Sequence, residues 1–130
     1  MNFVDTNFFL RFFRADIQSQ YLQVKELFLE ANKGKVKLAT STIVFFEINW
    51  VLKSYYAENK KNILNVLKKT LKLSFIFIEE RSILEKALEI FENTSLSLED
   101  CYNIVSARKQ GIKTFKTFDV KLERKAKELL

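Results

Sequence analysis

Short apolar segments alternate with longer helical ones along this 130-residue chain, and this alternation limits the folds it can adopt more than any other feature. Short apolar runs bounded by polar residues predict strands at residues 2–5, 36–39, 74–78 and 112–118. Apolar spacings of three and four predict helices at residues 8–13, 18–33, 43–56, from 59 onward, 82–93, 97–110 and 120–130. This order indicates an α/β fold with helices on both faces of a mostly parallel sheet. No linker or repeat interrupts it, which indicates a single domain over residues 1–130.

The composition excludes most of the common catalytic chemistries. The chain has no His, so it has neither an imidazole base nor a His-ligated zinc ion. Its single Cys excludes an internal disulfide and a thiolate zinc cluster, and fits a reducing, cytoplasmic location. Its two isolated glycines, Gly34 and Gly111, exclude a Gly-rich phosphate-binding loop. Enzyme chemistry would therefore depend on carboxylates, hydroxyls, amines or a hard metal ion held by oxygen.

Glu47 is the most informative acidic residue. It lies in the run 43–52, which is apolar nearly all round and so typical of a buried helix. Its neighbours one turn away are apolar, so no ion pair along the helix can neutralise it. Because a buried carboxylate is costly unless it is paired or binds a metal, Glu47 is a candidate ligand. The alternative is a Glu that reaches solvent from a thin polar stripe with Asn49 or Lys53.

Three aspartates lie at the ends of predicted elements. Asp5 and Asp119 each directly follow a predicted strand. Sites in parallel sheets form outside the carboxyl ends of strands, so both are expected at the same sheet edge. Asp100 lies in the first turn of the predicted helix at 97–110. Each of the three has an alternative as a helix cap, and Ser97 with Asp100 resembles a capping box.

These four acids would repel one another if they met in one cleft. A hard divalent cation such as Mg²⁺ relieves that repulsion, because it prefers oxygen ligands and keeps several waters. Two such ions could hold the attacking and leaving oxygens of a phosphoryl displacement, with water as the nucleophile and no need for His. The candidate metal ligands and catalytic residues are Asp5, Glu47, Asp100 and Asp119.

Five short motifs occur in a characteristic order over essentially the whole chain. They are Phe3-Val4-Asp5-Thr6-Asn7, Val44-Phe45-Phe46-Glu47-Ile48, Leu98-Glu99-Asp100, Ala107-Arg108-Lys109-Gln110-Gly111 and Thr117-Phe118-Asp119. Each is weak alone, but together they make the chain similar to the PIN-domain family. Within that family it most resembles the small VapC-like toxin ribonucleases of type II toxin–antitoxin pairs.

The resemblance implies a three-layer α/β/α sandwich and a Mg²⁺- or Mn²⁺-dependent endoribonuclease that cleaves single-stranded or loop RNA. The positions that match the family's acidic quartet are Asp5, Glu47, Asp100 and Asp119. Those that match its ligand-orienting polar positions are Thr6, Asn7 and Thr117. The resemblance further implies a toxin that forms a homodimer and is bound by a small antitoxin protein.

Some features depart from the family pattern, and other functions stay open. Cys101 and Tyr102 occupy positions where relatives often carry small residues, and Glu99 and Glu123 are further acids that could join the site. Cys101 itself is expected to be a small buried apolar residue. The alternatives are a PIN-type nuclease of RNA maturation or decay, and a non-catalytic PIN-fold binding domain, against which the intact quartet argues.

Basic side chains outnumber acidic ones by 22 to 16, which suits a polyanionic partner such as RNA. Setting the four candidate acids aside raises the formal charge on the rest of the chain from +6 to +10. The candidate phosphate contacts, which follow Asp5 or lie near Asp119, are Arg11, Arg14, Lys116 and Lys121. The alternative is that they are ordinary solvated charges. No apolar run approaches the roughly 20 residues of a membrane span, so no membrane association is expected.

The first predicted helix is unusually rich in phenylalanine. Phe8, Phe9, Phe12 and Phe13 carry more apolar surface than one face of a short helix can bury. They either pack in the core or form a surface that another protein chain covers.

Overall fold

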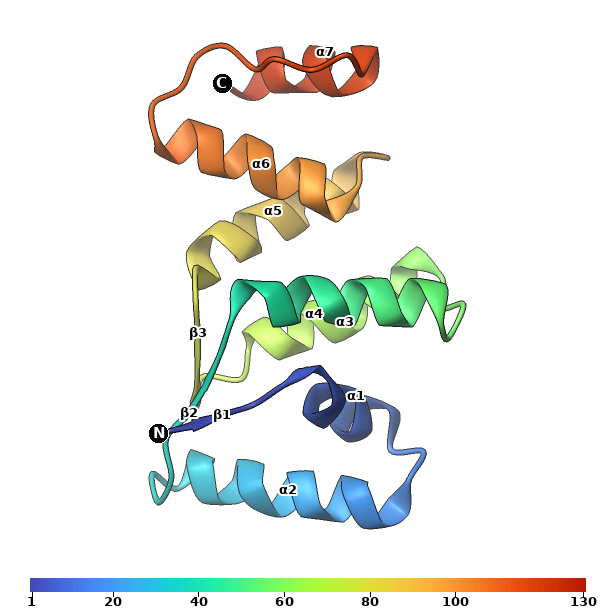
Figure 1. Ribbon diagram of the computed structural model, residues 1–130, viewed down its shortest axis with the longest axis vertical. Coiled ribbons are helices and arrows are strands. Elements are labelled where there is room, and N and C mark those ends of the chain that lie inside the picture. Colours follow the sequence, from blue (N-terminus) through green and yellow to red (C-terminus); the bar gives the residue numbers. More distant parts are fainter. The chain divides into compact units, whose positions relative to one another are not determined.

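A three-stranded parallel sheet lies in the first part of the chain (Figure 1). The computed structural model describes all residues, 1–130, and divides into two compact units, residues 1–80 and 81–130. The strands are β1 (Asn2–Phe3), β2 (Leu38–Thr40) and β3 (Ile76–Ile78), in the order β1-β2-β3. The parallel sheet and its flanking helices confirm the predicted α/β class. That the chain is one functional domain stays a prediction.

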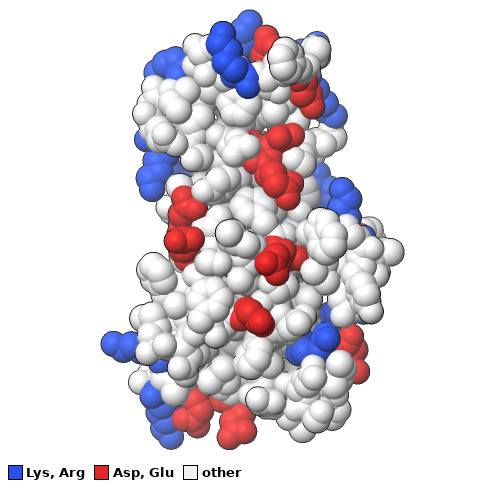
Figure 2. Space-filling view, in the orientation of Figure 1, with Lys and Arg blue, Asp and Glu red and all other residues white.

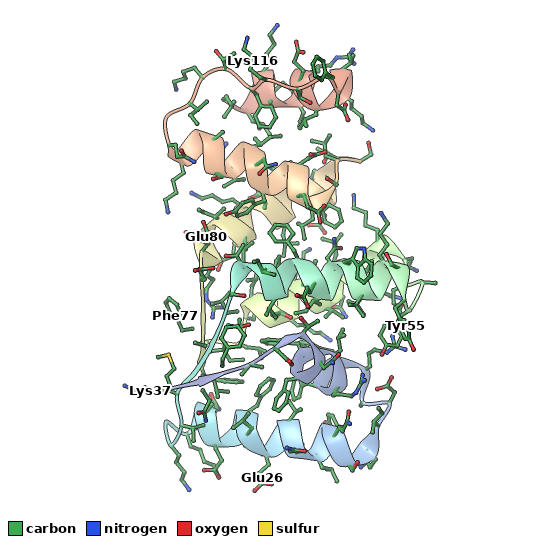
Figure 3. The ribbon with its side chains drawn as sticks, in the orientation of Figure 1. Glu26, Lys37, Tyr55, Phe77, Glu80 and Lys116 are labelled. Carbon is green, nitrogen blue, oxygen red and sulfur yellow. The ribbon has the colours of Figure 1, made fainter.

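The two faces of the sheet differ in burial. Leu38 pairs in register with Ile76, and both side chains are buried. On the opposite face, Phe3 and Phe77 flank Ala39 in register and are 62% and 65% exposed. Figure 3 shows Phe77 directed away from its strand. The apolar core of this unit therefore lies against the Leu38 face of the sheet.

Four helices belong to the unit of residues 1–80. They are α1 (Thr6–Arg14), α2 (Gln18–Asn32), α3 (Thr42–Ser54) and α4 (Lys60–Leu71). α3 begins where the Ser41 hydroxyl accepts the Val44 N–H at 3.3 Å, and α4 begins at Asn59, whose side chain accepts the Asn62 N–H at 2.8 Å. α1 packs against α2 and α3, and α3 packs against α4. These caps fix where α3 begins after β2 and where α4 begins after α3.

Aromatic rings form the core between the first two helices and the sheet. The Phe28 ring lies 6.1 Å from that of Phe9, 4.8 Å from that of Phe12 and 5.4 Å from that of Phe75. Phe9 is completely buried. Core packing thus accounts for Phe9 and Phe12 of the Phe-rich helix.

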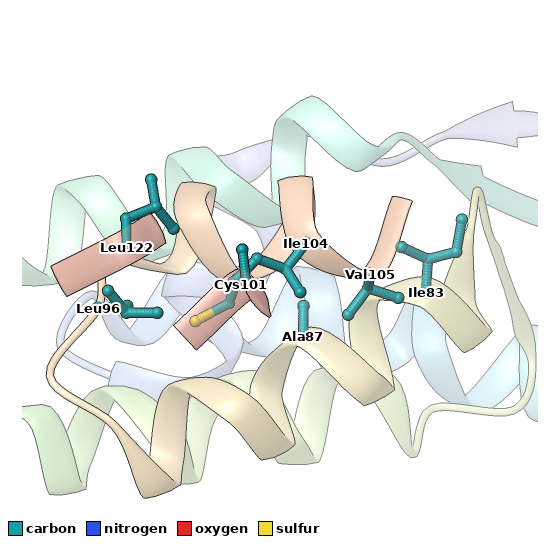
Figure 4. Close-up of a cluster of buried hydrophobic side chains, with 8 residues drawn as sticks. Ile83, Ala87, Leu96, Cys101, Ile104, Val105 and Leu122 are labelled. Atoms are coloured by element: carbon teal, nitrogen blue, oxygen red, sulfur yellow. The ribbon is translucent and has the colours of Figure 1, made fainter. Parts of the chain in front are cut away.

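Residues 81–130 form three helices, α5 (Arg81–Asn93), α6 (Leu98–Lys109) and α7 (Val120–Leu129). α6 packs against both α5 and α7. The buried cluster that they share is shown in Figure 4 and consists of Ile83, Ala87, Leu96, Cys101, Ile104, Val105, Leu122 and Ala126. Cys101 is a buried free thiol, which confirms its expected place in the core.

The predicted strand at residues 112–118 is wrong. The segment between α6 and α7 contains no strand, and most of its side chains are exposed. A strand needs a neighbouring strand to pair with its backbone N–H and C=O groups, and residues 81–130 contain helices and their connections but no strand. Two of the apolar residues in this segment have other roles. Phe115 packs against the buried cluster. The Ile112 N–H donates to the Ala107 carbonyl at 3.0 Å, at the end of α6.

Candidate active site

Asp5 and Glu47 are joined through Thr6. Asp5 is the N-cap residue of α1, directly after β1, and its side chain makes no capping hydrogen bond. The buried Thr6 hydroxyl donates to Glu47 Oε2 at 2.8 Å. Thr40 supports the same corner, because its hydroxyl donates to the Val4 carbonyl at 2.7 Å. The residue next to Asp5 thus holds a carboxylate that lies 41 positions further along the chain.

Glu47 is exposed, so the prediction that it is buried is wrong. α3 buries one side through Val44 and Ile48. The opposite stripe, with Ile43 and Trp50 beside Glu47, is in contact with solvent. The structure therefore supports the alternative, in which the Glu47 carboxylate reaches solvent. The stripe on which it lies is not polar as that alternative expected, because Ile43 and Trp50 are exposed beside it.

Asp100 and Asp119 both lie at helix starts of the unit 81–130. The Ser97 hydroxyl accepts the Asp100 N–H at 3.1 Å, so Ser97 caps α6 as the capping-box pattern indicates. Asp100 is half-buried. Asp119 Oδ1 accepts the Leu122 N–H at 3.0 Å, and the Thr117 hydroxyl accepts the Asp119 N–H at 3.1 Å.

Asp119 therefore does not follow a strand, and the reason for expecting it at one sheet edge with Asp5 is lost. Its capping bond occupies one carboxylate oxygen and leaves Oδ2 available. Asn7, Glu99 and Glu123 are exposed to solvent. Their roles stay predictions.

A second acidic pair follows β3, and sequence reasoning missed it. The Thr42 hydroxyl donates to Glu80 Oε1 at 2.8 Å, and the Thr42 N–H donates to Glu79 Oε1 at 3.2 Å. Both carboxylates thus bind the first turn of α3, where a negative charge is stabilised by the helix dipole. Their position directly after the predicted strand at 74–78 is the signal that could have identified them.

The donor chemistry of these residues fits a hard divalent cation. Asp5 is exposed and makes no capping bond, and Glu47 binds Thr6 through only one of its two oxygens. Carboxylates and hydroxyls are the ligands that Mg²⁺ and Mn²⁺ prefer. The structure contains no group of three or more His, Cys, Asp or Glu side chains placed to hold a metal ion.

Arg14 lies at the end of α1 away from Asp5 and is held by acidic neighbours. Its guanidinium group lies 3.0 Å from Glu58 and 3.3 Å from Asp16, and stacks 3.6 Å above the centre of the Tyr56 ring. Burial by itself lowers the pKa of Arg14. Its hydrogen bonds to Glu58 and Asp16 outweigh that effect, so the pKa of Arg14 lies above its ordinary value. Hydrogen bonds from Asn62 and Arg14 hold the pKa of Glu58 below its ordinary value.

The other three candidate phosphate contacts differ in how they are engaged. Arg11 donates to Gln20 at 2.6 Å, and Lys121 donates to the Ser95 hydroxyl. Lys116 is exposed and forms no ion pair (Figure 3). Of the four basic residues, Lys116 is therefore the freest to meet a phosphate.

The chain is an α/β protein in which the first strand of a parallel sheet leads into Asp5, and the next residue, Thr6, binds Glu47. The profile of the PIN domain matches residues 3–128, and the chain belongs to that family.

Comparison with solved structures finds VapC20 of Mycobacterium tuberculosis, a toxin described as cleaving the sarcin-ricin loop. It is 21% identical, with 96% of this chain and 95% of that chain covered, at a TM-score of 0.46. No curated protein sequence matches the chain. None of its helices combines the length and apolar character needed to cross a lipid bilayer.

Proposed function

We propose that this chain is a Mg²⁺- or Mn²⁺-dependent endoribonuclease that cleaves single-stranded or loop RNA. The hydrogen bond from Thr6 to Glu47 carries the proposal, because it joins the acid of α3 to the residue next to Asp5. Asp5 keeps its carboxylate free of capping, so two acids are available at one sheet edge. Membership of the PIN family, typically metal-dependent nucleases, supports the same reaction.

In this proposal Asp5 and Glu47 hold the divalent cation, with Asp100 and Asp119 as further ligands. When bound, the cation would supply Lewis-acid activation for hydrolysis of the phosphodiester bond. Thr6 fixes the orientation of Glu47, and Thr117 fixes the backbone of Asp119. Asn7 is proposed as a further polar group that orients ligands around Asp5. Chemistry of this kind needs no imidazole, in keeping with a chain that has no His.

Cleavage is expected to depend entirely on a divalent cation. A fluorescently labelled RNA with single-stranded and loop regions is incubated with the purified chain in Mg²⁺, in Mn²⁺ and in excess EDTA. We expect cleavage in both metals, none in EDTA, and recovery when Mg²⁺ is added back beyond the chelator. Failure to cut RNA in any metal would leave the non-catalytic PIN-fold domain as the better interpretation.

Thr6 is expected to act as a positioning residue for Glu47. Thr6→Val keeps the shape of this buried side chain and removes the hydroxyl, so we expect a loss of roughly 10- to 100-fold in activity or metal affinity. Thr6→Ser keeps the hydroxyl and should retain most of both. Mn²⁺ affinity, measured by calorimetry, gives a readout independent of cleavage. Equal behaviour of the Val and Ser variants would show that the hydrogen bond plays no such part.

We further propose that the chain acts in the cytoplasm as the toxin of a toxin–antitoxin pair, as a homodimer bound by a small antitoxin. A short neighbouring gene for a DNA-binding antitoxin would favour this role over RNA maturation or decay. Expression of the chain alone should then arrest growth, and co-expression with that neighbour should relieve the arrest.

A further inference from the structure

Phe118 is a fully exposed aromatic side chain between Thr117 and Asp119. A single exposed apolar residue is ordinary on a protein surface and carries little meaning by itself. Phe118 differs because it precedes a candidate catalytic acid and follows a basic segment, residues 113–117. Its ring is therefore available to a ligand that approaches from solvent.

A cavity of about 320 Å³ lies within the unit of residues 81–130, and Thr117, the residue before Phe118, belongs to its lining. Its polar lining comes from the segment before Phe118 and from α7, and consists of Lys113, Thr114, Lys116, Thr117, Glu123 and Lys127. Thr117 thus belongs both to the cavity wall and to the turn that holds the Asp119 N–H. We call this space the lysine pocket.

The lining of the lysine pocket carries a net positive charge, because it holds three lysines and one glutamate. Lys113, Lys116 and Lys127 form no ion pair, and Glu123 is the only acid in the lining. By contrast, Lys125 on the same helix pairs with Glu128 at 3.3 Å. Figure 2 shows basic side chains, with acidic ones among them, over the part of this face that carries α7. Ammonium groups with neighbouring hydroxyls suit an oxyanion such as a phosphate.

We propose that the lysine pocket and Phe118 form a subsite for single-stranded RNA, with a backbone phosphate in the pocket and an unpaired base stacked on the Phe118 ring. Proteins that bind single strands combine basic grooves with aromatic platforms in this way. The proposal rests on the proposed ribonuclease function, because the stacked base would lie beside Asp119. It gives the enzyme a means of selecting unpaired RNA.

The stacking half is tested by RNA binding in an Asp5→Asn background, which prevents cleavage during the measurement. Fluorescence anisotropy reports the affinity for a labelled, unstructured oligoribonucleotide. We expect Phe118→Ala to weaken binding roughly 5- to 100-fold and Phe118→Trp to keep or improve it. Phe77→Ala is the matched control, since Phe77 is exposed in the other unit, and should bind as the parent does.

The phosphate half is tested by the salt dependence of binding. The combined variant Lys113→Gln, Lys116→Gln and Lys127→Gln should bind RNA more weakly. The logarithm of its binding constant should also depend less steeply on the logarithm of the salt concentration, with a negative slope that is shallower by about 0.7 for each phosphate that the variant no longer neutralises. A matched variant with Lys25→Gln, Lys33→Gln and Lys61→Gln, all exposed in the other unit, should change the slope little.

Several outcomes would overturn the subsite. Unchanged RNA binding by Phe118→Ala would indicate a different occupant, such as a protein partner. Equal weakening by Ala and Trp at position 118 would exclude stacking, and equal slopes for the two lysine variants would exclude the pocket. If instead the wild type cuts no RNA while these binding differences persist, the proposed catalysis fails and the subsite stands.

Discussion

Replacing Asp5 with Asn, or Glu47 with Gln, is expected to abolish RNA cleavage while the fold stays intact. Both carboxylates are exposed, so an amide of the same shape should change the unfolding free energy by no more than about 0.5 kcal/mol. Each substitution removes a negative charge that a divalent cation needs. Because a metal ion can supply several kcal/mol of transition-state stabilisation, we expect the cleavage rate to fall on the order of 100-fold or more.

The measurement is the initial rate of cleavage of a labelled RNA at saturating Mg²⁺, with circular dichroism as the check on folding. Glu26→Gln is the matched control, because Glu26 is exposed on α2 and lies outside the candidate site (Figure 3). It should cut at the wild-type rate, and activity that follows the variant excludes a contaminating nuclease. Equal cutting by wild type, Asp5→Asn and Glu47→Gln would overturn the site assignment.

Within the first 80 residues the sequence predicts the elements well, because side-chain periodicity reports local burial. Short apolar runs bounded by polar residues place strands at β1, β2 and β3 to within a few residues. Helix starts follow polar caps such as Ser41 and Asn59, whose hydrogen bonds involve residues only three positions away. Local patterns are enough where the stabilising contacts are themselves local.

The segment 112–118 shows where local patterns fail. Its apolar and β-branched residues favour a strand, but pairing depends on a partner that no short window of sequence can reveal. The structure uses Phe115 for packing against helices instead. The error extends to the site, because the expected position of Asp119 at the sheet edge depended on that strand, and Asp119 caps α7.

Glu47 shows a different limit. The apolar run around it correctly predicts a helix, but high overall apolarity does not say which face meets solvent, and Ile43 and Trp50 are exposed beside it. Its contact with Thr6 links residues 41 positions apart. The family resemblance marks Thr6 as a ligand-orienting position, but it does not say which acid Thr6 binds. The candidate residue could be selected from sequence, whereas the interaction that makes Glu47 useful could be found only in the structure.

The corner that carries Asp5 depends on the packing of Phe9, one turn further along α1. Phe9 is fully buried, and its ring meets that of Phe28 at 6.1 Å, which connects α1 to α2. Phe28 in turn meets Phe75, just before β3. This row of rings therefore couples the helix that begins at Asp5 to the far strand of the sheet.

Phe9→Ala is expected to lower the unfolding free energy by about 3–5 kcal/mol, the usual cost of deleting a buried Phe ring and leaving a cavity. That is a large share of the 5–15 kcal/mol typical of whole domains. Urea unfolding followed by far-UV circular dichroism measures the change. Phe77→Ala removes the same ring from an exposed position and should cost no more than about 0.5 kcal/mol. Similar losses in the two variants would contradict the placement of Phe9 in the core, and with it the rigid support of the Asp5 corner.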